Sequence, residues 1–131
     1  MTKGRGCLLA HTMGLGKTLQ VIAFLITLAC LPPEAYSNLD MPEHLNSKTL
    51  KRDYKRFMIV CPPSIVVNWA NEFKKWTPRD CKDALGKIYC VNDSGVQERM
   101  ATIRKWYRDG GVLLSKSPSA ICALSFSRSD Y

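Results

Sequence analysis

One segment near the amino end constrains the fold of this chain more than any other: His11-Thr12-Met13-Gly14-Leu15-Gly16-Lys17-Thr18. It follows the apolar run Gly6–Ala10 and precedes a long apolar stretch that begins at Lys17. Glycines in the segment let successive backbone N–H groups turn toward one anion, and a helix that starts directly afterwards adds the positive end of its dipole. The order strand, loop, helix predicts a loop that binds nucleotide phosphates.

The residue types in this loop match a phosphate-binding role. Lys17 has the reach to contact the β- and γ-phosphates, and the Thr18 hydroxyl is the group that the Walker A pattern uses as a magnesium ligand. The sequence departs from the Walker A pattern at His11, where the pattern has a glycine. The alternative is an ordinary turn that starts a helix, and the apolar stretches on both sides favour the phosphate loop. The expected nucleotide-binding set is Met13, Gly14, Leu15, Gly16, Lys17 and Thr18, with Thr18 also the expected metal ligand.

Strand and helix candidates alternate along the rest of the chain. The expected strands are Gly6–Ala10, Phe57–Cys61, Lys87–Asn92 and a run from Val112; the expected helices are Lys17 to about Cys30, one that starts near Ser64, and one that Gly110-Gly111 ends. The apolar faces of the last two helices are expected to be Val66, Trp69, Ala70, Phe73 and Trp76, and Val96, Met100, Ile103 and Tyr107. This alternation predicts the α/β class, with a parallel sheet of about four strands and flanking helices.

The chain is expected to form one incomplete domain over residues 1–114, with a polar insertion at residues 31–56 and an irregular tail at residues 115–131. The insertion carries basic residues and is long for a structureless loop, so a short helix near Ser47 to Tyr54 is expected within it. The tail is rich in serine and has no clear hydrophobic period.

Composition narrows the possible partners. The net charge is +8, which suits a polyanion such as nucleic acid, although a solvated basic surface explains it equally well. The cysteines are too far apart for C-x-x-C metal pairs, and His11 and His44 are the only histidines, so no zinc site is expected. The apolar stretch Leu19–Leu31 is shorter than a bilayer crossing requires, and is expected to be a buried helix.

Two sequence blocks resemble the Swi/Snf-type helicase-like ATPases of superfamily two. The block Gly6–Ile22, with its M-G-L-G-K-T core, is similar to motif I of that family, and His11 is similar to the ATRX-like branch. The block Ile59–Trp76, with its C-P turn and N-W…E-F…W helix, is similar to motif Ia. The resemblance covers the start of the first of two RecA-like lobes.

The family resemblance implies ATP and Mg²⁺ as cofactors, a nuclear location, and double-stranded DNA or chromatin as the partner of the parent protein, with no membrane contact. By the same resemblance, Lys17 and Thr18 bind phosphate and magnesium, and Pro62, Pro63 and Ser64 approach the DNA backbone. For Ser64 the alternative is a plain helix N-cap. The sequence assigns no oligomeric state.

The departures from the family limit the expected activity. The chain has no D-E-x-H segment and no two adjacent acidic residues, so no catalytic residue is assigned. Because hydrolysis needs such carboxylates to hold magnesium and orient water, the sequence predicts ATP binding without turnover by a fragment of the motor, as from a truncated gene model. The alternatives are a non-catalytic DNA-binding remnant or regulatory module, and a small P-loop kinase whose lid arginines are not recognisable here.

Overall fold

The computed structural model describes residues 7–32, 35, 55–91 and 95–116. Its elements are, in chain order, α1 (Lys17–Cys30), β1 (Arg56–Val60), the 3-10 turn η1 (Pro63–Ile65), α4 (Val66–Trp76), the 3-10 turn η2 (Arg79–Cys81), α5 (Lys82–Leu85), β2 (Ile88–Val91), α6 (Val96–Asp109) and β3 (Gly111–Ser115). The expected helix near Ser47 to Tyr54, most of the insertion and most of the tail lie outside the described residues. In the described ranges, no helix is both long enough and apolar enough to cross a membrane.

The parallel sheet confirms the α/β class, although within the described residues it has three strands, in the order β1-β3-β2, and not the expected number of about four. Arg56 of β1 lies opposite Gly111 of β3, and Ile88 of β2 lies opposite Val112. β3 is therefore the central strand, and all five of its residues are buried. A strand covered on both faces is expected to be almost wholly apolar, as Val112-Leu113-Leu114 is.

The expected strand at residues 6–10 is wrong for its described part. Cys7 to Ala10 are exposed and form no strand. Apolar composition makes a strand only where a neighbouring strand supplies ladder hydrogen bonds. In the described part of the chain the two ladders join β1 to β3 and β2 to β3, and neither includes residues 7–10.

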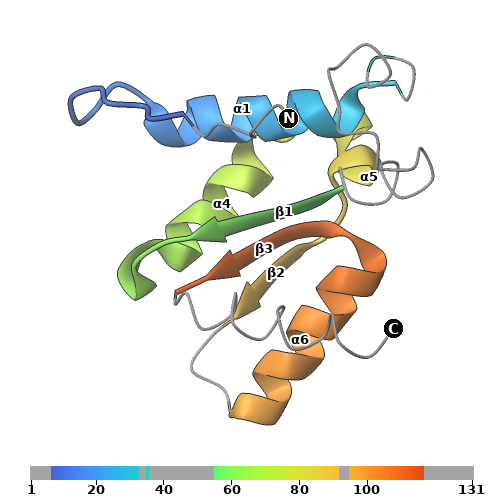
Figure 1. Ribbon diagram of the computed structural model, residues 1–131. Helices are drawn as coiled ribbons and strands as arrows, with labels where there is room; N and C mark the ends of the chain where they lie inside the picture. Colours follow the sequence, from blue (N-terminus) through green and yellow to red (C-terminus); the bar gives the residue numbers. More distant parts are fainter. Residues whose placement is uncertain (1–6, 33–34, 36–54, 92–94, 117–131) are drawn as a thin grey trace, which may run out of the picture.

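Helices cover both faces of the sheet, and the alternation of side chains along β3 determines which residues meet them. Val112 and Leu114 belong to a core cluster with Ile22 of α1, Phe73 of α4 and Leu85 of α5. Leu113 faces the other way and packs with buried residues of β2 and α6, namely Tyr89, Val91, Ile103 and Trp106. Figure 1 shows α6 on one face, with α4, α5 and α1 on the other.

Helix α1 has the expected bounds but is less buried than its composition suggests. It packs against α4 and α5, and its residue Ile22 belongs to the same core cluster as Val112 and Leu114 of β3. Only Ile22 and Ala29 of α1 are buried, whereas Leu19 and Phe24 are exposed. The expectation of a buried helix is therefore wrong for much of its surface, because this helix contacts two helices on one side instead of lying between layers.

Three expected core residues near helix ends are also exposed. Trp76, at the end of α4, is 41% exposed, and its indole N–H donates to the Glu72 carboxylate at 2.6 Å. Tyr107 of α6 is 46% exposed, and the buried aromatic residue of this helix is instead Trp106, whose indole N–H donates to the Gly111 carbonyl at 2.9 Å. Val96, at the start of α6, is exposed as well. Helical spacing alone predicts all three residues to be in the core, whereas the structure leaves each of them exposed.

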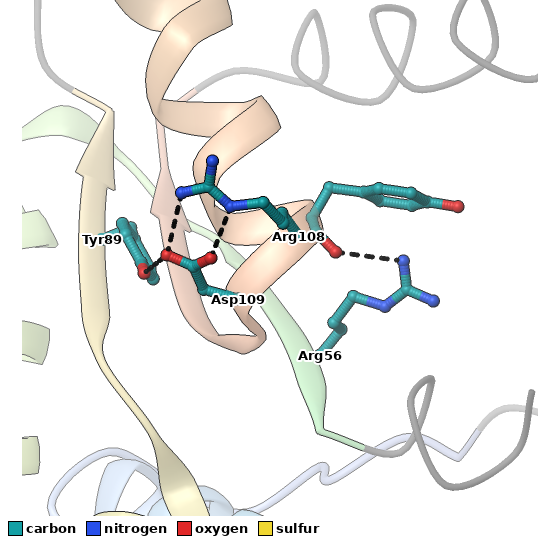
Figure 2. A network of polar contacts seen from close by, with 5 residues as sticks. Arg56, Tyr89, Arg108 and Asp109 are labelled. Carbon is teal, nitrogen blue, oxygen red and sulfur yellow. Dashed lines mark hydrogen bonds and ion pairs between the residues drawn. The ribbon is translucent and has the colours of Figure 1, made fainter. Parts of the chain in front are cut away.

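A polar network connects the carboxyl end of α6 to the strands on both sides of β3 (Figure 2). The Arg108 guanidinium donates to Asp109 at 2.7 Å, and the Tyr89 hydroxyl of β2 donates to the same carboxylate at 3.4 Å. These contacts, led by the Arg108 hydrogen bond, hold the pKa of the Asp109 carboxyl below its ordinary value. On the other side, the Arg56 guanidinium lies 4.1 Å from the centre of the Tyr107 ring.

The turn from α6 into β3 requires glycine because three backbone segments meet there. Gly111 has φ +103, its N–H donates to the Lys55 carbonyl at 2.6 Å, and the next N–H donates to the Lys87 carbonyl at 2.8 Å. A Cβ added at Gly111 would lie 2.2 Å from the Lys87 carbonyl oxygen. The central strand can therefore begin here only without a side chain.

We expect Gly111→Ala to lower the free energy of unfolding by about 3–5 kcal/mol, because it combines a positive φ with a backbone clash. Gly95→Ala is the matched control. Gly95 has an ordinary φ of −54 and no atom within 4 Å of an added Cβ, so only an N-cap effect of about 1 kcal/mol or less is expected. Urea denaturation followed by tryptophan fluorescence measures both, and equal losses in the two variants would contradict this account of the turn.

Candidate nucleotide-binding site

The segment between residue 10 and α1 forms a turn whose backbone depends on two glycines. Gly14 has φ +87, and Gly16, directly before the helix, has φ +70 and ψ 28. Both values lie in the left-handed region that glycine adopts at no steric cost. An added Cβ would meet no atom within 4 Å at either position, so backbone conformation and not crowding requires glycine here.

The amino end of α1 presents several N–H groups that the helix itself leaves without acceptors. The first intrahelical bond runs from the Gln20 N–H to the Gly16 carbonyl at 3.0 Å. The N–H groups of residues 16 to 19 precede that bond and have no acceptor within the helix. No side chain caps this end and no acidic residue lies in the first turn. An anion at this end therefore meets N–H donors and the positive end of the helix dipole, without a competing carboxylate from that turn.

Lys17 folds back over the loop. Its ammonium donates to the His11 carbonyl at 2.9 Å and to the Thr12 carbonyl at 2.8 Å. An ammonium group has three N–H donors, and these bonds use two of them. The lysine thus ties the start of the loop to the helix and keeps a positive charge beside the N–H groups of α1.

Gln20 contacts the loop, although no sequence pattern predicts this role. Its side-chain amide donates to the Leu15 carbonyl at 2.9 Å. The only sequence signal is position, because a residue one turn into a helix can reach the chain just before it. The structure therefore adds Gln20 to the residues that shape this loop.

The remaining expected site residues are accessible from solvent. Met13 is 94% exposed at the tip of the loop, and Leu15 is also exposed. Thr18 lies half-buried in the first turn of α1, next to Lys17. Its hydroxyl is an oxygen ligand of the kind that Mg²⁺ prefers. The described residues contain no group of three His, Cys, Asp or Glu side chains that could hold a metal.

The second expected contact, Pro62–Ser64, forms the turn between β1 and α4. All three residues are exposed, and the turn is closed by the Ile65 N–H, which donates to the Pro62 carbonyl at 3.1 Å. The N-cap of α4 is Ile65, without a side-chain cap, so the interpretation of Ser64 as the N-cap is wrong. The prolines favour a tight 3-10 turn, which moves the start of the α-helix two residues beyond Ser64.

The two turns belong to the same side of the molecule. Each one leads into the amino end of a helix, α1 or α4, and these helices pack against each other. In Figure 1 both amino ends point to the left of the view, at the side where the arrow of β1 ends. Ligands generally bind parallel α/β sheets at this carboxyl edge of the strands.

Comparison with known proteins agrees with the motifs. Residues 1–116 match the family model described as SNF2-related domain. The chain is 40% identical over 112 residues to Protein CHROMATIN REMODELING 20 of Arabidopsis thaliana, covering 86% of this chain and 6% of that protein. It is 36% identical over 114 residues to Transcriptional regulator ATRX of Homo sapiens, covering 85% of this chain and 4% of that protein.

DNA repair protein rhp54 of Schizosaccharomyces pombe is 38% identical over 101 residues, which cover 77% of this chain and 10% of that protein. No solved structure matches the chain. The chain thus spans a tenth or less of the length of these three relatives. The family-model match covers all of the described residues, including both turns. The chain belongs to the SNF2-related domain family of Swi/Snf helicase-like ATPases and resembles its ATRX-like members.

Proposed function

We propose that this chain binds ATP with Mg²⁺ through the loop Met13–Thr18 and does not hydrolyse it by itself. The observation that carries the proposal is the amino end of α1, where uncapped N–H groups and the Lys17 ammonium lie on one short loop. The shape of the loop is supported by bonds within the chain, so most of the anion-binding geometry exists before a ligand arrives. Family membership supports ATP as the ligand.

Lys17 has a specific part in this proposal. Before binding, its ammonium is held by the His11 and Thr12 carbonyls. Phosphate oxygens are stronger acceptors than neutral carbonyls for an ammonium donor, so the lysine is expected to turn toward the nucleotide. The Thr18 hydroxyl, in the first turn of α1, is placed to share Mg²⁺ with the phosphates. Bound Mg²⁺ supplies neutralisation of phosphate charge.

The lack of turnover follows from the side chains that this chain contains. Hydrolysis requires carboxylates that hold the metal and orient the attacking water. No two acidic residues are adjacent in the 131 residues, and β3 runs into Ser115 and Lys116 at its carboxyl edge. The chain therefore has phosphate-binding groups at this edge and lacks the paired carboxylates of a hydrolysis site.

The turn Pro62–Ser64 is proposed as a contact to the backbone of double-stranded DNA in the parent protein, which would act in the nucleus. Three observations support it: the turn is exposed, it lies at the same side of the molecule as the nucleotide loop, and the Ser64 hydroxyl does not cap α4. Backbone N–H groups and a hydroxyl at a helix start suit phosphate contacts without reading sequence. The net charge of +8 favours a polyanion.

Replacing Lys17 with alanine tests the nucleotide site. We expect Lys17→Ala to weaken binding of a fluorescent ATP analogue by about 10- to 100-fold, because hydrogen bonds from a charged donor to phosphate are lost. Lys82→Ala removes the same charge from an exposed site at the start of α5 and is expected to leave the affinity unchanged. An equal loss of ATP-analogue affinity in both variants would mean that the net charge of the chain, and not the position of Lys17, determines binding.

The wild-type chain also separates the two leading functions. Binding of the ATP analogue would support the proposed ATP-binding function. DNA binding without any ATP signal at any concentration would instead support the alternative of a DNA-binding remnant or regulatory module. A fluorescence titration with each ligand, on the same preparation, gives the comparison directly.

A charge substitution tests the DNA contact. We expect Ser64→Asp to weaken binding to a short double-stranded DNA by about fivefold at low salt, since a carboxylate would face phosphate. Asn71→Asp adds the same charge to an exposed position of α4 that is farther from the turn, and a smaller effect is expected. Fluorescence anisotropy measures both affinities. A larger loss for Asn71→Asp would place the DNA elsewhere on the molecule.

A further inference from the structure

The end of the nucleotide loop is fastened by one residue that bonds two successive carbonyls. The side-chain amide of Gln20 donates to the Leu15 carbonyl at 2.9 Å, while its backbone N–H donates to the Gly16 carbonyl at 3.0 Å. The second bond belongs to every α-helix, but the first depends on the side chain. Gln20 thus determines the orientation of a peptide unit that lies outside the helix.

The peptide unit in question joins Leu15 to Gly16. It is trans, as are all described peptide bonds, so its C=O and its N–H point in opposite directions. When the Gln20 amide holds the Leu15 oxygen against the flank of α1, the Gly16 N–H must point away from that flank. This constraint matters at glycine, because Gly16 has few steric limits on its backbone rotation.

We propose that Gln20 is a positioning residue for nucleotide binding, and that its side chain holds the Gly16 N–H toward the phosphate position at the amino end of α1. The inference rests on the proposed ATP-binding function. In this proposal, two side chains each hold one end of the loop. Lys17 holds the beginning of the loop through the His11 and Thr12 carbonyls, and Gln20 holds its end through the Leu15 carbonyl.

The chemistry of glutamine suits this position. Its amide donates a hydrogen bond without adding charge, whereas a glutamate there would lack the donor at neutral pH and place a negative charge near the phosphates. A lysine would add a flexible charge without the planar amide. Methionine has a similar length and good helix propensity but no donor, so it removes the hydrogen bond with little change to the helix.

The test compares Gln20→Met with Gln97→Met in the full 131-residue chain, because Gln97 is an exposed glutamine of α6 on the other face of the sheet. We expect Gln20→Met to weaken binding of the fluorescent ATP analogue by about fivefold, the usual effect of one hydrogen bond. We expect Gln97→Met to bind as the wild type does. Unfolding midpoints of the two variants should agree, since both positions are exposed. An unchanged affinity in Gln20→Met would overturn the proposal.

An NMR measurement without nucleotide separates this proposal from the proposed function. We expect the Gly16 amide signal to shift in Gln20→Met and not in Gln97→Met. In the wild type, the side-chain amide of Gln20 should exchange its hydrogens with solvent more slowly than the side-chain amide of Gln97. This second measurement does not depend on the folding of any variant. The positioning role would be overturned if the Gly16 amide signal were unshifted in Gln20→Met, or if the side-chain amides of Gln20 and Gln97 exchanged at equal rates. If both expectations hold but the wild type binds no ATP, the positioned amide remains and the proposed function fails.

Discussion

The position of β3 is the constraint on which the rest of the structure depends. β3 pairs with β1 and β2 at once and is buried along its whole length. It begins at Gly111, where the absence of a side chain lets the Lys55 and Lys87 backbones approach. From β3 the side chains alternate toward two helical layers. One layer, α4 with α5, supports α1, and the start of α1 carries the nucleotide loop. The loop geometry is thus connected to the central strand through three helices.

Much of this arrangement could be predicted from sequence, because local signals agreed with the tertiary structure. The bounds of α1 follow from the loop before it and the prolines after it, and Gly110-Gly111 predicts the end of α6 and the start of β3. The parallel sheet followed from the alternation of helix and strand candidates. In each case one residue type, glycine or proline, imposed a backbone conformation that no neighbour could override.

The errors arose where a residue's environment depends on distant parts of the chain. Cys7 to Ala10 are as apolar as a strand, but ladder hydrogen bonds come from neighbours that periodicity cannot identify. Trp76 and Tyr107 fit the expected helical spacing, but Trp76 is exposed at the end of α4, and in α6 the neighbouring Trp106 is buried in place of Tyr107. Gln20 was missed because a polar residue in an apolar helix has no distinctive pattern, and its contact with Leu15 depends on the path of the loop.

Phosphate binding and hydrolysis need different groups of the protein. A phosphate site needs N–H groups, a cation and a hydroxyl, all of which lie within residues 14 to 20 on one loop and one helix turn. Hydrolysis needs carboxylates that hold the metal and orient water, and the sequence contains no two adjacent acidic residues. The most direct measurement uses MgATP labelled at the γ-phosphate. The chain is mixed with an equimolar amount of this nucleotide, the bound nucleotide is isolated by rapid filtration, and its products are analysed after an acid quench. We expect the chain to retain intact ATP, and the amount of released inorganic phosphate to equal that in a control without protein. Failure to retain ATP, or phosphate release by the wild type that Lys17→Ala abolishes, would contradict the account.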